Sequence, residues 1–469
     1  MAACRVMTTA LHSDDDRTMA EPGPLRVAVI GAGPAGIYAV GALLEADPAA
    51  SVDVFEALPA PFGLVRYGVA PDRPKMRSVA TKLAEILASP RVRFLGNVAY
   101  GTDLTGEDLR RHYHAVIHAS GSPNERALGI PGEDLDGSFA AADFVAWYNG
   151  HPGATDQGFL DARDVVVVGG GNVALDVARM LLTDAEALVA TDLPADVLDA
   201  WRSAQATDVY LLARRGPAFA KFTTPELREL ADLEGVGLIV EPADLELDPA
   251  SAAVLVASRA AKRNVAVLQQ WAAAPAAAPR RMHFSFWARP TEIHGSRHVE
   301  GVTVERTRLD DTGPLVATGA TERVSAKAVF RAIGYAGTPV PGLPFDEAKA
   351  TVPNSAGRVT GAGQAGRYVA GWIKRGPVGV IGTNKSDAAE TVRSLLADAP
   401  TLRAPPEPDP AAVLVTLDRA GVRYFGWDDW LRLDAYEVTE GERRGRPRVK
   451  VRTVDQMLDI GTRRTEHRA

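Results

Sequence analysis

The sequence predicts an α/β fold with two parallel-sheet domains, the second of which is inserted within the first. An apolar strand, a glycine-rich turn and a helix follow one another at residues 26–44, and the same order recurs at residues 164–182. Two similar apolar strands, at 115–121 and 328–335, mark where the chain leaves the first domain and returns to it. Strand, glycine turn and helix in this order are typical of Rossmann-like dinucleotide-binding domains.

Length and composition indicate a globular protein of two to three domains. The chain has 469 residues, of which 46% are hydrophobic and 24% are charged, and globular domains usually hold roughly 100–200 residues. The net charge of −7 argues against a general nucleic-acid binder. It leaves room for a local basic patch that binds an acidic partner.

Cysteine content and hydropathy exclude several classes of site. The single cysteine, Cys4, rules out a disulfide, a cysteine-ligated cluster and a C-x-x-C redox pair, and we predict no metal site. No apolar run approaches the ~20 residues needed to cross a membrane. Residues 1–24 are acidic and lack the apolar core of a signal peptide, so we expect a flexible extension on a monomeric, cytoplasmic protein.

The first glycine motif spans residues 26–36, R-V-A-V-I-G-A-G-P-A-G. Val27 to Ile30 predict a buried strand, and a helical pattern begins at Ala35. Gly31 would allow the tight turn, Gly33 would let the backbone approach a pyrophosphate, and Gly36 would let helix and strand pack closely. The helix N-terminus offers free N–H groups to phosphate oxygens.

The second strand of this domain, Val52 to Glu56, ends in an acid 25 residues after Gly31. In this kind of fold an acid at that place binds the adenosine ribose hydroxyls; the alternative is a solvated strand end. The apolar loop at 59–72 suits a segment folded over a large flat ligand. A helix at 75–88 and strands at 92–95 and 115–121 complete the region.

The second glycine motif, D-V-V-V-V-G-G-G-N-V-A at 164–174, follows a connecting segment at 122–161 that prolines interrupt. The next strand, Val209 to Ala213, ends in Arg214 and Arg215 instead of an acid. Arginines pair with a 2′-phosphate in a forked geometry, and each charge-assisted hydrogen bond contributes roughly 1.5–3 kcal/mol. The first site therefore suits FAD and the second NADP, unless the arginines are an ordinary surface pair.

The remaining segments set the predicted domain boundaries. We expect a helix at 250–280, strands at 282–287 and 301–306, and a late strand and glycine turn at 367–383 before a helix at 385–396. The FAD domain is predicted at 25–121 and 335–469, with an appendage from about residue 401 in which we predict no chemistry. The NADP domain is predicted at 122–334.

A protein that holds FAD and NADPH but has no redox dithiol must pass its electrons elsewhere. Flavin accepts a hydride and releases electrons singly, so a one-electron acceptor is natural. Two alternatives remain open from the residues alone. One is a flavin monooxygenase or a reductase of another acceptor, and the other is a non-catalytic NADP-sensing module.

Several longer motifs resemble one family. They are G-L-V-R-Y-G-V-A-P-D (63–72), G-G-N-V-A-L-D-V-A-R (170–179), A-R-R-G-P (213–217), F-T-T-P-E-L-R-E-L (222–230) and G-W-I-K-R-G-P-V-G-V-I-G-T (371–383). In this order they closely resemble the adrenodoxin-reductase-like ferredoxin–NADP+ reductases, which include mitochondrial and actinobacterial enzymes. The resemblance runs from about Arg26 past Leu396, and G-R-P-R-V-K (445–450) extends it into the tail.

The resemblance implies an FAD enzyme that passes electrons between NADPH and ferredoxin or a similar iron–sulfur protein. It implies FAD contacts from Ala35, Glu56, Leu64, Val98, Trp372 and the backbone of Gly379, Val380 and Ile381. It implies NADP contacts from Arg126, Gly170, Gly171, Asn172, Val173, Arg214, Arg215 and Glu226. Trp372 could equally be a core aromatic residue.

Three further positions bear on the chemistry. The resemblance implies that Gly379 lies where nicotinamide and flavin meet, because a side chain there would block stacking. Asp176 could join a polar network near the rings or lie on the helix surface. The family often has histidine after A-P-D, where this chain has Arg73, so a proton relay at that position is in doubt.

Charged residues at Lys262, Arg263, Arg280 and Arg281 are candidates for a basic face that would dock an acidic ferredoxin. Ordinary solvated charges are the alternative explanation. The sequence names neither the physiological acceptor nor the direction of electron flow.

Replacing both Arg214 and Arg215 with alanine is expected to raise the KM for NADPH strongly and to leave that for NADH nearly unchanged. The reason is that only NADPH carries the 2′-phosphate that the two guanidinium groups would bind. Steady-state kinetics with both nucleotides measures the effect. Equal losses for the two nucleotides would contradict the assignment.

Overall fold

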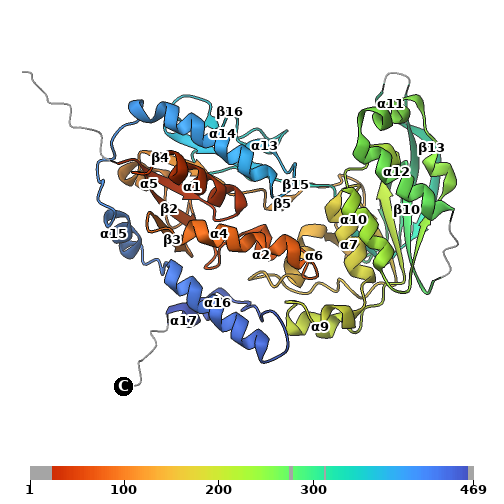
Figure 1. The fold of residues 1–469 in the computed structure, drawn as a ribbon. Helices are drawn as coiled ribbons and strands as arrows, with labels where there is room; N and C mark the ends of the chain where they lie inside the picture. Colours follow the sequence, from red (N-terminus) through yellow and green to blue (C-terminus); the bar gives the residue numbers. More distant parts are fainter. Residues whose placement is uncertain (1–23, 274–277, 311–312, 463–469) are drawn as a thin grey trace, which may run out of the picture.

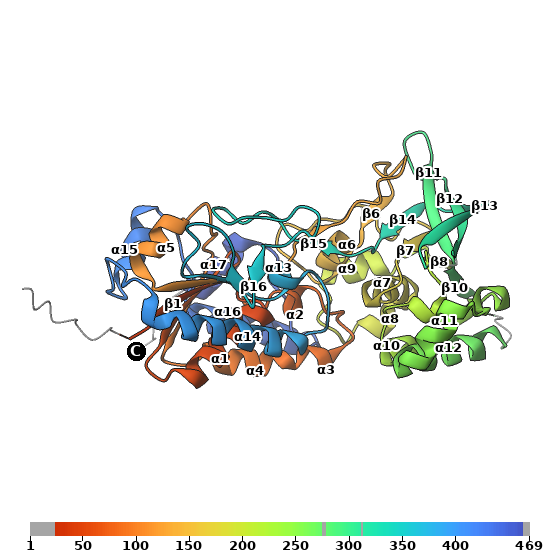
Figure 2. The same cartoon turned by 90° about the horizontal axis from the view of Figure 1, so that it is seen from above.

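The computed structural model describes residues 24–273, 278–310 and 313–462. The predicted extension, apart from Pro24, lies outside these residues, as do Cys4 and residues 274–277 of the predicted helix at 250–280. Two lobes lie side by side (Figures 1 and 2). We call the lobe around the seven-stranded sheet the first lobe and the lobe around the six-stranded sheet the second lobe.

The first lobe holds a sheet of strand order β16-β17-β18-β4-β1-β2-β3, parallel from β18 to β3. Its strands are β1 Arg26–Ile30, β2 Ser51–Glu56, β3 Val92–Gly96, β4 Ala115–His118, β16 Asn354–Ser355, β17 Arg358–Val359 and β18 Arg367–Val369. Its helices are α1 Pro34–Ala46, α2 Leu64–Tyr67, α3 Pro74–Arg77, α4 Val79–Leu87, α5 Gly106–His112, α13 Trp372–Arg375, α14 Thr383–Asp398, α15 Ala412–Arg419, α16 Trp427–Glu442 and α17 Val454–Thr462.

Strand β1 shows how the first sheet is covered on both faces. Val27 and Val29 pack into the core that α1, α4 and α14 share, whereas Ala28 and Ile30 face the core formed by α5 and α15. Because successive strand residues point to opposite faces, a strand buried on both sides must be apolar throughout. This explains the continuous apolar run that predicted the strand.

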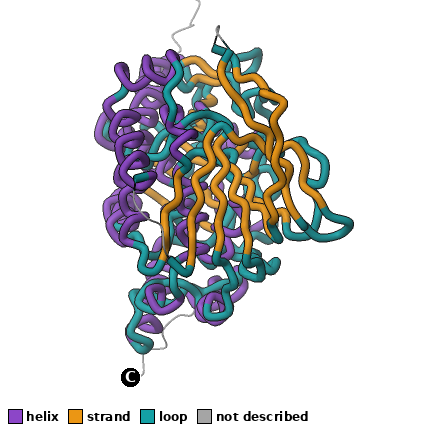
Figure 3. Tube along the Cα trace, turned by 90° about the vertical axis from the view of Figure 1, so that its right-hand side faces the viewer, coloured by secondary structure: helices purple, strands orange, loops and turns teal. Residues whose placement is uncertain are grey.

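The second lobe has three layers. Its parallel sheet has the order β6-β14-β7-β8-β10-β9, with helices on one face and the antiparallel sheet β11-β12-β13 on the other, as Figure 3 shows. The strands are β6 Ser138–Ala140, β7 Asp164–Val168, β8 Asp208–Ala213, β9 Val236–Val240, β10 Arg280–Phe286, β11 Ala288–His294, β12 Gly301–Leu309, β13 Leu315–Ser325 and β14 Ala328–Arg331. The helices are α6 Ala141–Tyr148, α7 Asn172–Leu182, α8 Ala185–Leu188, α9 Ala195–Trp201, α10 Thr224–Glu229, α11 Pro249–Ala257 and α12 Arg259–Ala272.

Two short strands join the lobes. The similar strands at 115–121 and 328–335 belong to different sheets, since β4 lies in the first and β14 in the second. The chain crosses just beyond each of them, where β5 Asn124–Glu125 pairs antiparallel with β15 Tyr335–Ala336 (Figure 1). These strand bounds are compatible with the predicted division at 121/122 and 334/335. The connecting segment at 122–161 also contains helix α6, which the prolines did not suggest.

Residues 401–462 are integral to the first lobe rather than an appendage to it. Trp430 and Leu433 of α16 are buried in the same apolar core as α1. The ring of Trp430 meets Phe62 edge-on, with 5.7 Å between ring centroids. The C-terminal helices therefore close the core that carries the first glycine turn.

A buried ion pair fixes α16 to the loop at 59–72. Nη2 of Arg66 lies 2.5 Å from Oε1 of Glu437, and their side chains are only 5% and 0% exposed. The same carboxylate oxygen accepts the N–H of Val451 at 3.0 Å. The charge of Glu437 raises the pKa of Arg66, although desolvation opposes the rise. Part of the predicted loop is helical: it contains α2, which carries Arg66.

Arg66→Met is expected to lower the free energy of unfolding by about 3–5 kcal/mol, because it leaves the buried carboxylate of Glu437 without its partner. Denaturant unfolding followed by tryptophan fluorescence measures the loss. Asp459→Asn is the matched control, since its ion pair with Arg423 is exposed at both ends and should leave the midpoint almost unchanged. Equal effects of the two substitutions would contradict this account of the tail.

Candidate dinucleotide sites at the lobe interface

The first glycine turn has the geometry that its spacing predicts. Gly31 has a φ of +105°, and a Cβ there would lie 2.6 Å from the carbonyl oxygen of Ala119. A Cβ on Gly36 would lie 2.0 Å from the carbonyl oxygen of Gly31, so helix and strand meet at their backbones. A Cβ on Gly33, in contrast, would meet nothing within 4 Å. The turn is closed on the protein side and open where a phosphate would approach.

Helix α1 directs unpaired N–H groups into this open space. It begins at Pro34, so Ala35 and Gly36 are in the first turn, whose N–H groups have no acceptor within the helix. The first turn holds no acidic residue, so the positive end of the helix dipole is not neutralised there. These are the features that bind a pyrophosphate.

Glu56 is tied to the turn. Its Oε2 accepts the N–H of Ala32 at 2.8 Å, and its Oε1 accepts the N–H of Leu58 at 3.3 Å. Burial raises the pKa of this carboxyl, and these backbone hydrogen bonds oppose the rise. A solvated strand end would show neither effect. Each oxygen retains capacity for a further donor, such as a ribose hydroxyl.

The other residues predicted at the first site lie around the turn in different ways. A Cβ on Gly63 would lie 3.2 Å from the Cα of Gly33, so Leu64 follows directly beside the turn, 42% exposed. Val380 is 56% exposed, whereas Ile381 packs against the core of the first lobe. An exposed apolar side chain such as that of Leu64, next to an open turn, fits a flat aromatic ligand. Val98 is buried, and its N–H is bonded to the carbonyl oxygen of Glu56 at 2.9 Å.

Trp372 begins α13 at the crossing between the lobes. Its ring lies 5.4 Å from that of Tyr335 in β15, with an angle of 32° between the planes. The preceding Gly371 has a φ of +76°, and a Cβ there would lie 2.5 Å from the Cβ of Ala35. Trp372 is therefore next to α1 and partly buried, so it is not a fully buried core residue.

The second glycine turn repeats the first. Gly169 has a φ of +154°, and a Cβ there would lie 2.4 Å from the carbonyl oxygen of Ala332, whereas Gly171 again faces open space. Ala174 replaces the third glycine and is fully buried. The segment after Arg215 folds back onto this turn through two backbone donors. Lys221 N–H donates to the carbonyl of Gly170 at 2.7 Å, and Thr223 N–H donates to Oδ1 of Asn172 at 2.8 Å. Val173 packs partly against the core.

Arg214 and Arg215 are exposed at the end of β8. The guanidinium of Arg215 lies 5.7 Å from the ring centroid of Phe219, and the backbone carbonyl of Arg214 accepts a hydrogen bond from the hydroxyl of Thr307. Among the residues that the structure describes, no carboxylate forms an ion pair with either guanidinium. A cavity of about 440 Å³ begins three residues further on and lies between residues 218–225 and 254–264.

Glu226 carries a buried oxygen that lacks a partner. No described residue makes a hydrogen bond to its Oε2. Burial raises the pKa of Glu226, an effect that the nearby Arg73 opposes. An unpaired buried carboxylate oxygen beside Asn172 of the second turn fits a hydroxyl donor from a bound nucleotide. Arg126, by contrast, is exposed, with its Nη2 3.4 Å from the carbonyl oxygen of Lys349.

Arg73 connects the lobes at the start of α3. Its side chain is 9% exposed and lies 2.9 Å from Oδ1 of Asp176 and 2.6 Å from Oε2 of Glu229. Arg179 joins the same Asp176 oxygen at 3.1 Å and also pairs with Asp72. Asp176 thus lies in an ion network instead of on a free helix surface. Glu229, Arg179 and Asp72 were not predicted, although they lie within the quoted motifs.

Gly379 lies in a strained part of the segment at 371–383. It has a φ of +92°, and a Cβ there would lie 2.7 Å from Oγ1 of Thr383. That hydroxyl also accepts the N–H of Val380 at 3.2 Å. Glycine is therefore needed for the local backbone, in addition to any role in ring stacking.

Comparison with known proteins decides the family. The family model of pyridine nucleotide-disulphide oxidoreductases matches residues 25–241. NADPH-ferredoxin reductase FprA of Mycobacterium tuberculosis is 43% identical over 457 residues, which cover 93% of this chain and 99% of that protein. The human mitochondrial NADPH:adrenodoxin oxidoreductase is 40% identical over 455 residues, covering 93% of this chain and 91% of that protein. The chain belongs to this family of NADPH-ferredoxin and NADPH:adrenodoxin oxidoreductases.

The family membership extends to the three-dimensional structure. The structure of M. tuberculosis FprA in complex with NADPH matches with a TM-score of 0.88 and 42% identity, covering 93% of this chain and 99% of that chain. The predicted family and the predicted α/β fold with two dinucleotide-binding domains are confirmed. In that structure FprA is in complex with NADPH. Within the described residues, no helix has the length and apolar character of a membrane span, and no group of side chains is arranged as a metal site.

Gly379→Trp is expected to slow hydride transfer while FAD stays bound, because a ring at this position would occupy the stacking space. Gly379→Ala is the matched control, since it introduces the same backbone strain without the ring. Anaerobic stopped-flow measurement of flavin reduction by NADPH, with FAD content determined from absorbance, compares the variants. Equal reduction rates in the two variants would show that no ring stacks at Gly379.

Proposed function

We propose that this protein transfers electrons from NADPH through FAD to ferredoxin or a similar iron–sulfur protein. One observation carries the proposal. Two open glycine turns, each between a strand and a helix, lie in adjoining lobes, and the strands beside them end in an acid at one turn and, at the other, in two arginines that pair with no carboxylate of the described residues. Bound FAD would accept a hydride from NADPH and release electrons singly.

The first lobe, residues 25–121 and 335–469, would hold FAD. The turn from Gly31 to Gly36 and the N–H groups of α1 would bind the pyrophosphate, and Glu56 would bind the ribose. The exposed apolar side chains of Leu64 and Val380 would cover the ring system and exclude water from it. The remaining predicted contacts are Val98, Trp372, Gly379 and Ile381.

The second lobe, residues 122–334, would hold NADP(H). Gly170 to Val173 would bind its pyrophosphate, and Arg214 and Arg215 its 2′-phosphate. The unpaired oxygen of Glu226 supports a contact with a nucleotide hydroxyl. Arg126 would approach from the crossing between the lobes.

Arg73 and Asp176 have a proposed electrostatic role. A guanidinium does not give up its proton in a protein, so Arg73 cannot relay one as a histidine could. It would instead hold Asp176 and Glu229 in place beside the second turn. This assigns the network to orientation and charge, with no proton transfer through Arg73.

The proposal includes a cytoplasmic monomer that docks an acidic iron–sulfur protein. Of the four basic candidates, Arg281 is paired with Asp208 at 2.6 Å, and Arg280 donates to the carbonyl of Glu234 at 3.1 Å. Lys262 and Arg263 on α12 are thus the better candidates for such a face. Charge reversal at these two residues, compared with charge reversal at Arg280, would test whether Lys262 and Arg263 form the docking face.

The purified protein should be yellow, and its flavin should be reduced by NADPH in the absence of oxygen. Reduction of cytochrome c should then depend on added ferredoxin, because the flavin passes electrons singly to the iron–sulfur protein. Assays with NADPH and NADH, each with and without candidate ferredoxins, measure this coupling. Protein that is colourless after gentle purification and takes up no flavin would contradict the proposal. Tight coupling of NADPH oxidation to an oxygenated product would favour a monooxygenase.

A further inference from the structure

The segment Arg446 to Arg452, which we call the strap, follows α16 and runs along both lobes (Figure 1). Towards the first lobe it is bonded to α16. Val449 N–H donates to the carbonyl of Glu437 at 2.8 Å, and Nη1 of Arg448 lies 2.5 Å from Asp434. The strap is therefore fixed to the first lobe through its backbone and one side chain.

Three other strap side chains reach the second lobe. Arg446 donates to the carbonyl of Leu193 at 2.9 Å. Arg452 donates to the carbonyl of Ala154 at 3.1 Å and pairs with Asp196 at the start of α9. Lys450 lies between them. The strap thus bridges the two lobes, in addition to the chain crossings and the ion pairs of Arg73, Arg77 and Arg179.

Lys450 is the most buried member of the strap, with a side chain 1% exposed. Its Nζ lies 3.0 Å from Oδ2 of Asp192 and donates to the carbonyl of Asn149 at 3.0 Å, both in the second lobe. It also donates to the carbonyl of Arg66 at 3.2 Å, in the first lobe. All three N–H groups of the ammonium are used, and their acceptors lie on both sides of the interface.

The charges around Lys450 are unequal in number. Arg77 reaches the same Asp192 and also donates to Oδ1 of Asn149 at 2.5 Å. Four cations, from Arg66, Arg77, Lys450 and the less buried Arg448, thus share two anions, from Asp192 and Glu437. The other titratable groups on the surrounding elements include Tyr67, His151, Asp196, Asp434, Arg446 and Arg452. Lys450 is the cation of this buried set that can lose its proton.

We propose that the strap holds the two lobes in the orientation that hydride transfer requires and that Lys450 is its positioning residue. This inference rests on the proposed electron transfer from NADPH to FAD. The nicotinamide and the flavin would be held by different lobes, so their separation is set by how the lobes meet. Misplacement of reacting atoms by about 1 Å can cost roughly a hundredfold in rate.

The closure of the two lobes is expected to depend on pH through Lys450. Desolvation, together with Arg77 and Arg66, lowers the pKa of Lys450 to about 7, although Asp192 opposes this. Opened to water, the same ammonium would have a pKa of about 10.4. Between these values the open state binds one more proton, so closure strengthens as the pH rises, by up to about tenfold per pH unit. Below about pH 7 the effect disappears.

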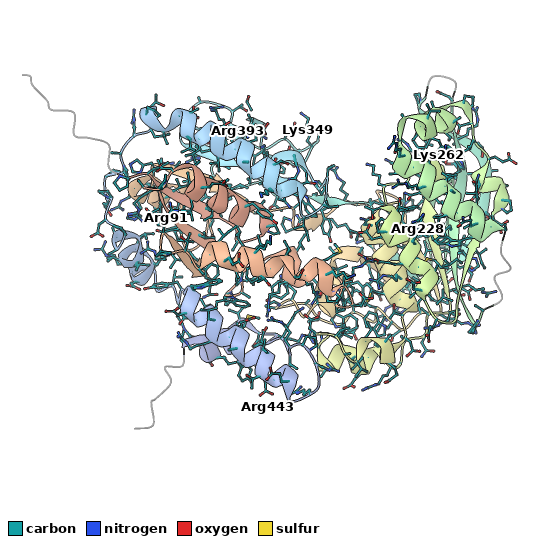
Figure 4. The ribbon with its side chains drawn as sticks, in the orientation of Figure 1. Arg91, Arg228, Lys262, Lys349, Arg393 and Arg443 are labelled. Carbon is teal, nitrogen blue, oxygen red and sulfur yellow. The ribbon has the colours of Figure 1, made fainter. Side chains whose placement is uncertain are left out.

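The test measures the rate of flavin reduction and the distance between the two lobes. Lys450→Met holoenzyme is compared with wild type for anaerobic flavin reduction by NADPH and for the distance between spin labels. Labels at Lys262→Cys on α12 and Arg393→Cys on α14, in a Cys4→Ser background, report on the two lobes (Figure 4). We expect a rate about tenfold to a hundredfold lower at saturating NADPH, with NADPH affinity within about threefold of wild type, and a broadened or shifted distance distribution.

Two variants separate positioning from general damage. Arg448→Met removes strap contacts to α16 only and should keep the wild-type rate and distance. Below about pH 7, where Lys450 is itself charged, Lys450→Arg keeps the cation and should restore part of the reduction rate and of the wild-type label distance. The distribution of label distances in the wild type should narrow between pH 7 and 9. In Lys450→Met this distribution should not change with pH. If Lys450→Met does not fold, Asp192→Asn, which keeps the side-chain volume, replaces it.

A Lys450→Met protein with the wild-type distribution or the wild-type reduction rate would overturn the inference. Loss of rate in Arg448→Met equal to that in Lys450→Met would overturn it as well. If NADPH fails to reduce the flavin of the wild type, the proposed function fails. The label distances then still show whether Lys450 orients the lobes.

Discussion

The two lobes meet through buried charges, and the proposed transfer between the two nucleotide sites would depend on that contact. One short stretch, from α2 to the end of α3, supplies three arginines. Arg66 pairs with Glu437 inside the first lobe, whereas Arg73 pairs with Asp176 and Glu229, and Arg77 with Asp192, across the interface. Each pair is directional, and a buried charge that loses its partner is strongly destabilising. The loop predicted to cover a flat ligand also contacts the second lobe, because its last residue, Asp72, pairs with Arg179.

In the proposed function the same kind of glycine turn would bind two different cofactors, because the residues that distinguish them lie outside the turn. The turns at Gly31 and Gly169 have the same close contacts and the same open position two residues later. What differs is the end of the neighbouring strand, where Glu56 is bonded to its own turn and Arg214 and Arg215 are left without carboxylate partners among the described residues. In folds of this kind the glycine turn binds the pyrophosphate, and the charged residues at the end of the next strand distinguish one nucleotide from another.

Sequence reasoning succeeded where the signal is local. The strand–turn–helix order and the charge at a strand end depend on a few consecutive residues, so β1, α1, β7 and β8 were predicted within a few positions. It failed where partners are distant in the chain. Nothing around Glu437 or Lys450 indicates that they meet Arg66 or Asp192, so α16 and the strap were expected to be an appendage without chemistry. The pairing of β5 with β15 was missed because both strands have only two residues.

The polar character of the interface has a structural consequence. An apolar interface tolerates sliding, because any close contact removes surface from water. Ion pairs such as Arg73 with Asp176, and an ammonium such as Lys450 with acceptors on both lobes, are satisfied in one arrangement only. A small rotation would leave several of these groups buried and unpaired together, so intermediate orientations are disfavoured.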